Sequence, residues 1–285
     1  MKWTRGTKND DVIDVRGQRP SGRGVKMSVG GIALLLGAVL LSRALGVDLT
    51  GLVTGGGGSG TPPQPDPKAR GSGPDPDAEM IDFIKDVMKD IQDTFDTKFK
   101  EQGWPYRRAK LYIFTELIDT KCGRSSSAIG PFYCPGDENA YIDLSFYRDL
   151  KERFKAPGDF AQAYVLAHEI GHHVQNLRDA DAEVKRKNPN ESRNRHSVRI
   201  ELQADCYAGV WGHSAKQRSK LDMDDFDEAI TAASAIGDDR LQQQAGRDVK
   251  PETFTHGTSE QRKKWFRRGY ETGRLDACDT FSEEP

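Results

Sequence analysis

The chain has few cysteines, no long run of basic residues in its globular part and only one long apolar run. Its four cysteines all lie after residue 100, and none forms the C-x-x-C pair typical of a cysteine-bound zinc ion. The 42 basic and 44 acidic residues nearly cancel, to a net charge of −2. Without a basic patch, nucleic acid is a poor candidate partner. The 285 residues show no internal repeat and suit one large domain with attached segments.

The N-terminal part of the chain falls into two stretches of different character. Residues 1–26 are polar, with more Lys and Arg than Asp, and they lack apolar periodicity, so we expect a disordered segment. Residues 27–47 are almost wholly apolar or small, apart from Arg43, which could snorkel from the end of a helix. About 20 such residues suffice to cross ~30 Å of hydrocarbon. A transmembrane helix, a cleaved signal peptide and a buried core helix are all compatible with this run.

The flanking residues favour the transmembrane helix. The polar leader is long for a signal peptide, and a core helix would need a folded neighbour. Basic residues precede the apolar run and do not follow it directly, so we expect a single-pass protein with a cytoplasmic N-terminus and an extracytoplasmic domain. The lipid bilayer is then one partner. Residues 48–77 are rich in Gly and Pro and predict a linker.

Residues 78–285 are expected to form an α+β domain that is mainly helical and contains a small sheet. Apolar residues from Ile81 to Phe95 recur at helical spacing and predict a helix that ends before Gly103. Residues 122–134 are rich in Gly, Ser and Pro and predict a loop. The other expected elements are strands at 111–114 and 141–144, helices at 146–154, 160–177, 199–216 and 224–236, and a polar excursion at 179–197.

The stretch from His168 to His172 follows the pattern H-E-x-x-H. Residues four apart on a helix share one face, so His168 and His172 can present two imidazole nitrogens to one ion. Glu169 lies about 100° further round the helix and can reach a water held by that ion. The rest of this helix is largely apolar, and a His-Glu-His face in such a helix needs a reason. The pattern therefore predicts a zinc hydrolase.

A catalytic zinc ion usually takes three protein ligands and keeps a fourth position for water. Glu201 and Asp205 stand out among the downstream candidates because they lie four apart on a predicted helix and so share a face. We expect Glu201 to bind the ion and Asp205 to accept the N–H of a ligand histidine, which fixes its tautomer. The predicted centre holds one zinc ion per chain. The other downstream candidates are His196, His213 and His256.

His256 is a candidate for a further catalytic role. Thr258 and Gln261 have the spacing of a capping box, which places His256 just before a helix N-terminus. An oxyanion that forms at zinc commonly receives an additional hydrogen bond, and His256 could donate it. A purely structural histidine is the open alternative. His173 and His213 are expected to be structural or exposed.

Several motifs together resemble the bacterial family called "putative neutral zinc metallopeptidase", whose motif architecture is similar to that of the gluzincin branch of zincins. The resemblance implies a zincin-like fold and a membrane-anchored peptidase that acts on peptides or proteins. It runs from the apolar run almost to the C-terminus. Its motifs are residues 46–52, Gly130-Pro131-Phe132-Tyr133-Cys134-Pro135, residues 168–175, Glu201-Leu202-Gln203-Ala204-Asp205-Cys206, residues 237–241 and Thr255-His256-Gly257.

In this interpretation, zinc lowers the pKa of a bound water toward ~7 and polarises the scissile carbonyl. Glu169 takes the proton of that water as general base and passes it to the leaving amine. By analogy with gluzincins, the strand at 141–144 could pair with an extended substrate. Two alternatives are a catalytically inactive zinc-binding envelope module that recruits a protein partner, and a structural envelope protein without zinc.

An extracytoplasmic domain would favour disulfide bonds. Cys122 and Cys134 bracket one loop and are the expected pair, which leaves Cys206 to bond with Cys278. Four cysteines allow three connectivities, and free buried thiols are the alternative.

Overall fold

The structure is a computed structural model in which residues 1–17 and 74–283 are described. The predicted transmembrane helix at 27–47 and most of the predicted linker at 48–77 lie outside the described residues. Of the helices in the described part, none combines the length and the apolar character needed to cross a membrane.

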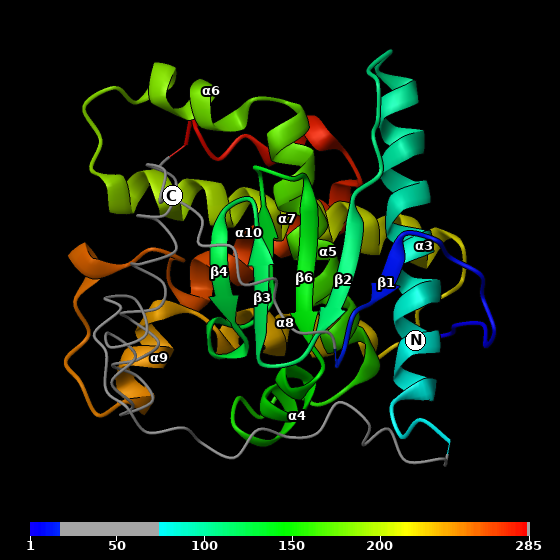
Figure 1. Cartoon of the computed structure of the whole chain (residues 1–285). Coiled ribbons are helices and arrows are strands. Elements are labelled where there is room, and N and C mark those ends of the chain that lie inside the picture. The colour runs from blue at the N-terminus through cyan, green and yellow to red at the C-terminus, as the bar shows by residue number, and fades with distance from the viewer. Residues whose placement is uncertain (18–73, 284–285) are drawn as a thin grey trace.

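A four-stranded sheet lies at the front of the molecule in Figure 1, with the order β1-β2-β6-β5. The first three of these strands run parallel, and the edge strand β5 is antiparallel to β6. A separate hairpin joins β3 to β4. The strands are β1 (Val12–Asp14), β2 (Lys110–Phe114), β3 (Leu117–Thr120), β4 (Gly123–Ser126), β5 (Phe132–Cys134) and β6 (Asn139–Asp143).

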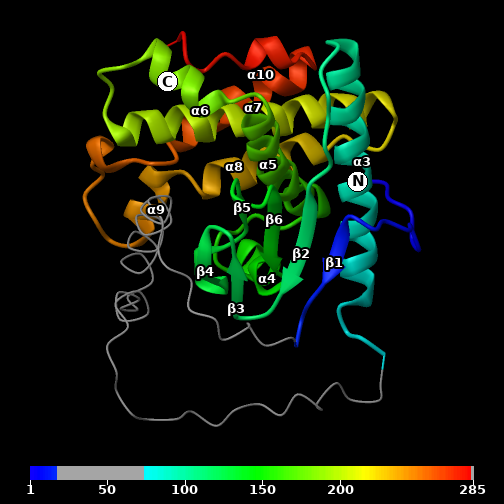
Figure 2. The same ribbon diagram turned by 45° about the horizontal axis from the view of Figure 1, so that its top comes forward.

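The helices gather on one side of this sheet, and α7 and α10 lie side by side in Figure 2. The central helix α5 contacts α3, α7 and α8 and also touches β5 and β6. The prediction of a mainly helical α+β domain with a small sheet is therefore confirmed. The helices are α3 (Ala78–Glu101), α4 (Ser145–Glu152), α5 (Asp159–Leu177), α6 (Ala180–Lys187), α7 (Arg193–Gln217), α8 (Asp225–Ala235), α9 (Asp238–Gln244) and α10 (Ser259–Thr272).

The predicted loop at 122–134 and the predicted excursion at 179–197 were wrong in part. The first contains β4, which pairs with β3 although it begins with Gly, a residue depleted in strands, and β5 (Phe-Tyr-Cys), which pairs with β6. The second contains α6 and the first turn of α7. Val184 of α6 is fully buried in a small cluster with Phe281, so a helix with a polar sequence has an apolar anchor.

Residues 1–17 correct the prediction that residues 1–26 are disordered. Strand β1 pairs with β2 from Val12 to Asp14, and the ring of Trp3 meets that of Phe83 edge-on with centroids 5.7 Å apart. The segment showed no periodicity because a three-residue strand is too short to produce one. Its order comes from tertiary contacts, and the folded unit extends beyond the predicted domain at 78–285.

Both predicted disulfide bonds are present. Cys122 bonds to Cys134, the last residue of β5, and so closes the segment 122–134. Cys206 bonds to Cys278 and ties α7 to the C-terminal segment.

Candidate metal centre

The centre lies where α5 crosses α7, and a glycine permits that close approach. A β-carbon on Gly171 would stand only 2.9 Å from the carbonyl oxygen of Ala204 on α7. The glycine inside the H-E-x-x-H stretch is therefore required for packing. This approach brings His168 and His172 of α5 opposite Glu201 of α7.

The three predicted ligands converge. His168 Nε2 lies 3.2 Å from one carboxylate oxygen of Glu201, and His172 Nε2 lies 3.6 Å from the other. One ligand atom from each of the three residues lies within 4.8 Å of those of the other two. Tetrahedral zinc with bonds of about 2.0–2.1 Å keeps its ligand atoms roughly 3.3 Å apart. Two imidazoles and one carboxylate at this spacing fit a catalytic zinc ion.

The pKa values of the cluster are shifted by the close approach of its charges. Burial works to raise the pKa of the Glu201 carboxyl, but the nearby imidazoles of His172 and His168 hold it well below its usual value. Burial works to lower the pKa of His168, but the carboxylates of Asp205 and Glu201 raise it to about 10. These opposite shifts favour positive charge beside Glu201 and Asp205, and a metal ion bound at this point would supply it.

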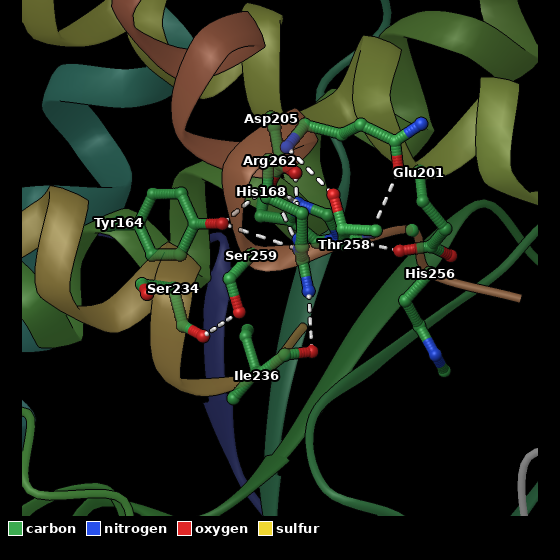
Figure 3. Close-up of polar contacts among 12 residues, drawn as sticks. Tyr164, His168, Glu201, Asp205, Ser234, Ile236, His256, Thr258, Ser259 and Arg262 are labelled. Atoms are coloured by element: carbon green, nitrogen blue, oxygen red, sulfur yellow. Dashed lines mark hydrogen bonds and ion pairs between the residues drawn. The ribbon is translucent and has the colours of Figure 1, made fainter. Parts of the chain in front are cut away.

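A buried hydrogen-bond network contacts Nδ1 of His168, the ring nitrogen that does not face Glu201, and so orients the imidazole (Figure 3). Asp205 is 0% exposed, and its Oδ1 lies 2.9 Å from His168 Nδ1. Arg262 of α10 donates two hydrogen bonds to the Asp205 carboxylate, at 2.8 and 2.9 Å, and the Tyr164 hydroxyl donates a third. The predicted contact between Asp205 and a ligand histidine is therefore present. A carboxylate without solvent keeps its charge through such partners.

Glu169 and His256 line the same cavity as the three candidate ligands. Glu169 is 8% exposed, and burial raises the pKa of its carboxyl. His256 Nδ1 lies 3.1 Å from Asp238 Oδ1, while the backbone N–H groups of Thr255, His256 and Gly257 all donate to Asp238 Oδ2. The Asp238 carboxylate therefore fixes both the loop and the imidazole that it carries.

The other histidines in the described part of the chain bind elsewhere. His173 is fully buried between the Tyr133 hydroxyl and the carbonyl of Arg107, and His213 binds the carbonyl of Tyr270. Both agree with the structural role expected of them. His196 also lines the cavity, but its Nε2 lies 2.9 Å from Asp181 Oδ1.

The cavity has a volume of about 1590 Å³, which exceeds the usual range for small-molecule sites. Its lining includes residues 127–133, which lead into and form part of β5. The predicted substrate-pairing strand at 141–144 was wrong, because β6 already pairs with β2 on one side and β5 on the other. Sheet topology, which the sequence did not reveal, makes β5 the edge strand on this side.

The sequence profile of the family described as "Putative neutral zinc metallopeptidase" matches residues 1–281. The chain belongs to this family. It is 44% identical to "Uncharacterized protein YpfJ" of Escherichia coli K12, over 99% of each chain. It is also 46% identical to "Uncharacterized protein Rv2575" of Mycobacterium tuberculosis H37Rv, over 62% of this chain and 64% of the relative. No solved structure matches the chain significantly.

The family description implies zinc, and the donor set at the crossing of α5 and α7 agrees with it. Sequence reasoning missed Arg262, Tyr164 and Asp238. Tyr164 lies one turn before His168 on the same face, which was the one available signal. Asp238 stands in the family motif at 237–241, but nothing there pointed to His256. Arg262 comes from a third helix, and no local pattern connects it to Asp205.

Proposed function

We propose that this member of the family is a zinc-dependent peptidase that hydrolyses internal peptide bonds. The observation that carries the proposal is the convergence of His168, His172 and Glu201 beside Glu169 in one large open cavity. An ion with a purely structural role is usually enclosed by four protein ligands. Three ligands at a cavity wall leave room for water and substrate.

Zinc would be held by His168, His172 and Glu201 and would supply a Lewis acid that polarises the scissile carbonyl and acidifies water. Glu169 acts as general base on the attacking water and then as general acid toward the leaving amine. Burial raises the pKa of Glu169, which brings it closer to the operating pH and favours proton transfer in both directions.

His256 donates a hydrogen bond to the oxyanion that develops on the substrate. Because Asp238 engages its Nδ1, Nε2 is the nitrogen that remains for the substrate. Burial works to lower the pKa of His256, but the hydrogen bond to the Asp238 carboxylate raises it, which favours the protonated donor.

The substrate is an extended peptide or an unfolded protein segment. The cavity is large enough for several residues, and β5 pairs only with β6 among the described strands. Its free edge is available for pairing with a substrate backbone. The two disulfide bonds favour a site outside the cytoplasm. Membrane attachment through residues 27–47 stays a prediction.

The test measures zinc content and cleavage of an unfolded, fluorescently quenched protein substrate, with and without a chelator. The wild-type chain is expected to bind one zinc ion and to cleave. Glu169→Gln is expected to bind the same zinc and to lose cleavage, whereas the control Glu260→Gln, at a side chain that is 83% exposed, keeps both. A wild-type chain that binds zinc but cleaves nothing would support the alternative, a module that recruits a protein partner. Wild-type cleavage rates in Glu169→Gln would refute its role as base.

A further inference from the structure

The second candidate ligand histidine, His172, has a side-chain hydrogen-bond partner that takes no direct part in the proposed reaction. Gln175 lies three residues further along α5, is 4% exposed, and places its Oε1 2.8 Å from His172 Nδ1. Its Nε2 lies 2.7 Å from the carbonyl oxygen of Ile200 and 3.1 Å from Gln203 Oε1. Both neighbours of Nε2 are oxygens, so the two amide protons of Gln175 are used there.

This arrangement decides which way the amide points. A backbone carbonyl can only accept, so the atom of Gln175 that faces Ile200 must be the NH2 group. The atom that faces His172 is then the carbonyl oxygen, which accepts the N–H of Nδ1. In neutral His172 the proton therefore sits on Nδ1, and the lone pair of Nε2 faces the carboxylate of Glu201, 3.6 Å away.

Gln203 continues this chain of hydrogen bonds. Its Nε2 donates to the backbone oxygen of Cys278 at 2.9 Å, so its Oε1 is free to accept from Gln175. Cys278 is in turn bonded to Cys206 of α7. The NH2 group of Gln175 thus has two fixed partners. One is the carbonyl of Ile200 on α7, and the other is Gln203, which is itself bound to the disulfide-bonded C-terminal segment.

We propose that Gln175 is a positioning residue that holds His172 in its metal-binding tautomer, as Asp205 does for His168. The two partners differ in charge. Gln175 is a neutral amide and Asp205 a carboxylate, so His172 should be a weaker metal ligand than His168. This inference requires the metal site of the proposed function but does not require peptide hydrolysis.

The test compares Gln175→Leu with the control Gln243→Leu, which removes an exposed glutamine of α9. Zinc affinity is measured by competition with a chromophoric chelator, and the histidine tautomers by 15N NMR. Gln175→Leu is expected to weaken zinc binding about 10- to 100-fold and to give His172 mixed tautomers, with Gln243→Leu unchanged. Gln203→Leu, which leaves the contact with His172 in place, is expected to show a smaller loss and serves if Gln175→Leu does not fold.

A folded Gln175→Leu chain with wild-type zinc affinity and an unchanged tautomer would overturn the proposal. Failure of the wild-type chain to bind zinc would refute the metal site itself. Zinc binding without peptide cleavage would refute only the proposed function.

A separate observation concerns the N-terminal segment, residues 1–17. It is built into the domain along its whole length. Asn9 and Thr7 bind α3 through Lys85 and Asp86, and Asp11 pairs with Arg108 of the next segment at 2.6 Å. The family profile also begins at residue 1, so this segment is part of the shared sequence.

Residues on either side of the stretch 18–73 meet in the fold. Arg16 lies at the last described turn before it, and its guanidinium binds Asp75 at 2.5 Å and Asp77 at 2.6 Å just after it. Strand β1 pairs with β2 next to this point. The chain therefore leaves and re-enters the domain at one place.

We infer that residues 1–17 and the domain at 74–283 occupy the same compartment. Two segments that share a sheet cannot lie on opposite sides of a membrane. A single crossing by residues 27–47, with a cytoplasmic N-terminus and an extracytoplasmic domain, is therefore incompatible with this fold. This inference is independent of the proposed function.

The test uses the full chain in cells and two single substitutions at exposed side chains, Arg5→Cys and Lys100→Cys, which are 74% and 72% exposed. Labelling by a membrane-impermeant maleimide is followed before and after permeabilisation of each membrane. Both positions are expected to become accessible at the same step. Accessibility of the two positions at different steps would overturn the inference.

Discussion

Two groups of charged side chains hold this molecule together in different ways. At the crossing of α5, α7 and α10, the side chains of Asp205 and Arg262 are only 0% and 2% exposed. At the N-terminal edge of the sheet, Asp11 is 12% exposed, but its partner Arg108 is 33% exposed. Little solvent can replace a lost partner in the first group, whereas water reaches the charges of the second. Substitutions should therefore cost much more at the metal centre than at the sheet edge.

The largest effect is expected from Glu201→Gln. This substitution removes a carboxylate that binds the ion directly. The loss of zinc affinity should therefore exceed roughly 100-fold, which is the upper limit for residues that contact a ligand but not the ion. Zinc content after dialysis measures it. Retention of one zinc ion per chain would contradict the assignment of Glu201.

Asp205→Ala should have the next largest effect, on folding stability. It leaves the Arg262 guanidinium buried without its carboxylate, and breaking a buried pair in this way costs about 3–5 kcal/mol. Chemical denaturation of the zinc-free chain measures the loss, so that zinc binding does not contribute. A loss below about 1 kcal/mol would mean that water reaches Arg262 and that the two groups of charges are alike.

Asp238→Asn tests an intermediate case, because His256 is 37% exposed while Asp238 is 8% exposed. The Asp238 carboxylate helps to raise the pKa of His256, so its removal should lower that pKa. The protonated donor exists below this pKa and is lost as pH rises through it. The alkaline limb of kcat/KM should therefore move to lower pH.

The control for this experiment is Asp248→Asn, which changes an exposed carboxylate outside the site. Its pH profile should match that of the wild-type chain. An unchanged alkaline limb in Asp238→Asn would show that His256 does not titrate in the reaction.

The smallest effect is expected from Asp11→Asn, at the edge of the sheet. Its partners Arg108 and Lys110 are partly exposed and keep contact with water, so the loss should be within about 1 kcal/mol. Thermal unfolding at low and high salt measures it, and the loss should shrink as salt rises. Asp10→Asn, at an exposed neighbour, is the control. A loss as large as that of Asp205→Ala would end the distinction between the two regions.

The helices of the centre were predictable because local chemistry defines them. A spacing of four placed His168 with His172 and Glu201 with Asp205, and the Thr258–Gln261 capping box is present at the start of α10. Cysteine pairing followed from a count of four and one short loop. Each of these signals lies within one segment and is read without knowledge of any other.

What the tertiary structure decided depends on segments that are distant in sequence. The approach of α5 to α7 at Gly171, the arrival of Arg262 at Asp205, and the contact between Gln175 and Gln203 all join separate helices. The order of the sheet made β6 internal, and pairing with β2 ordered a segment that resembled a disordered tail. Sequence alone determined which residues could bind zinc, because periodicity sets the face of a helix. Only packing determined what holds those residues in place, because a buried charge or a short strand is stable only beside its partner.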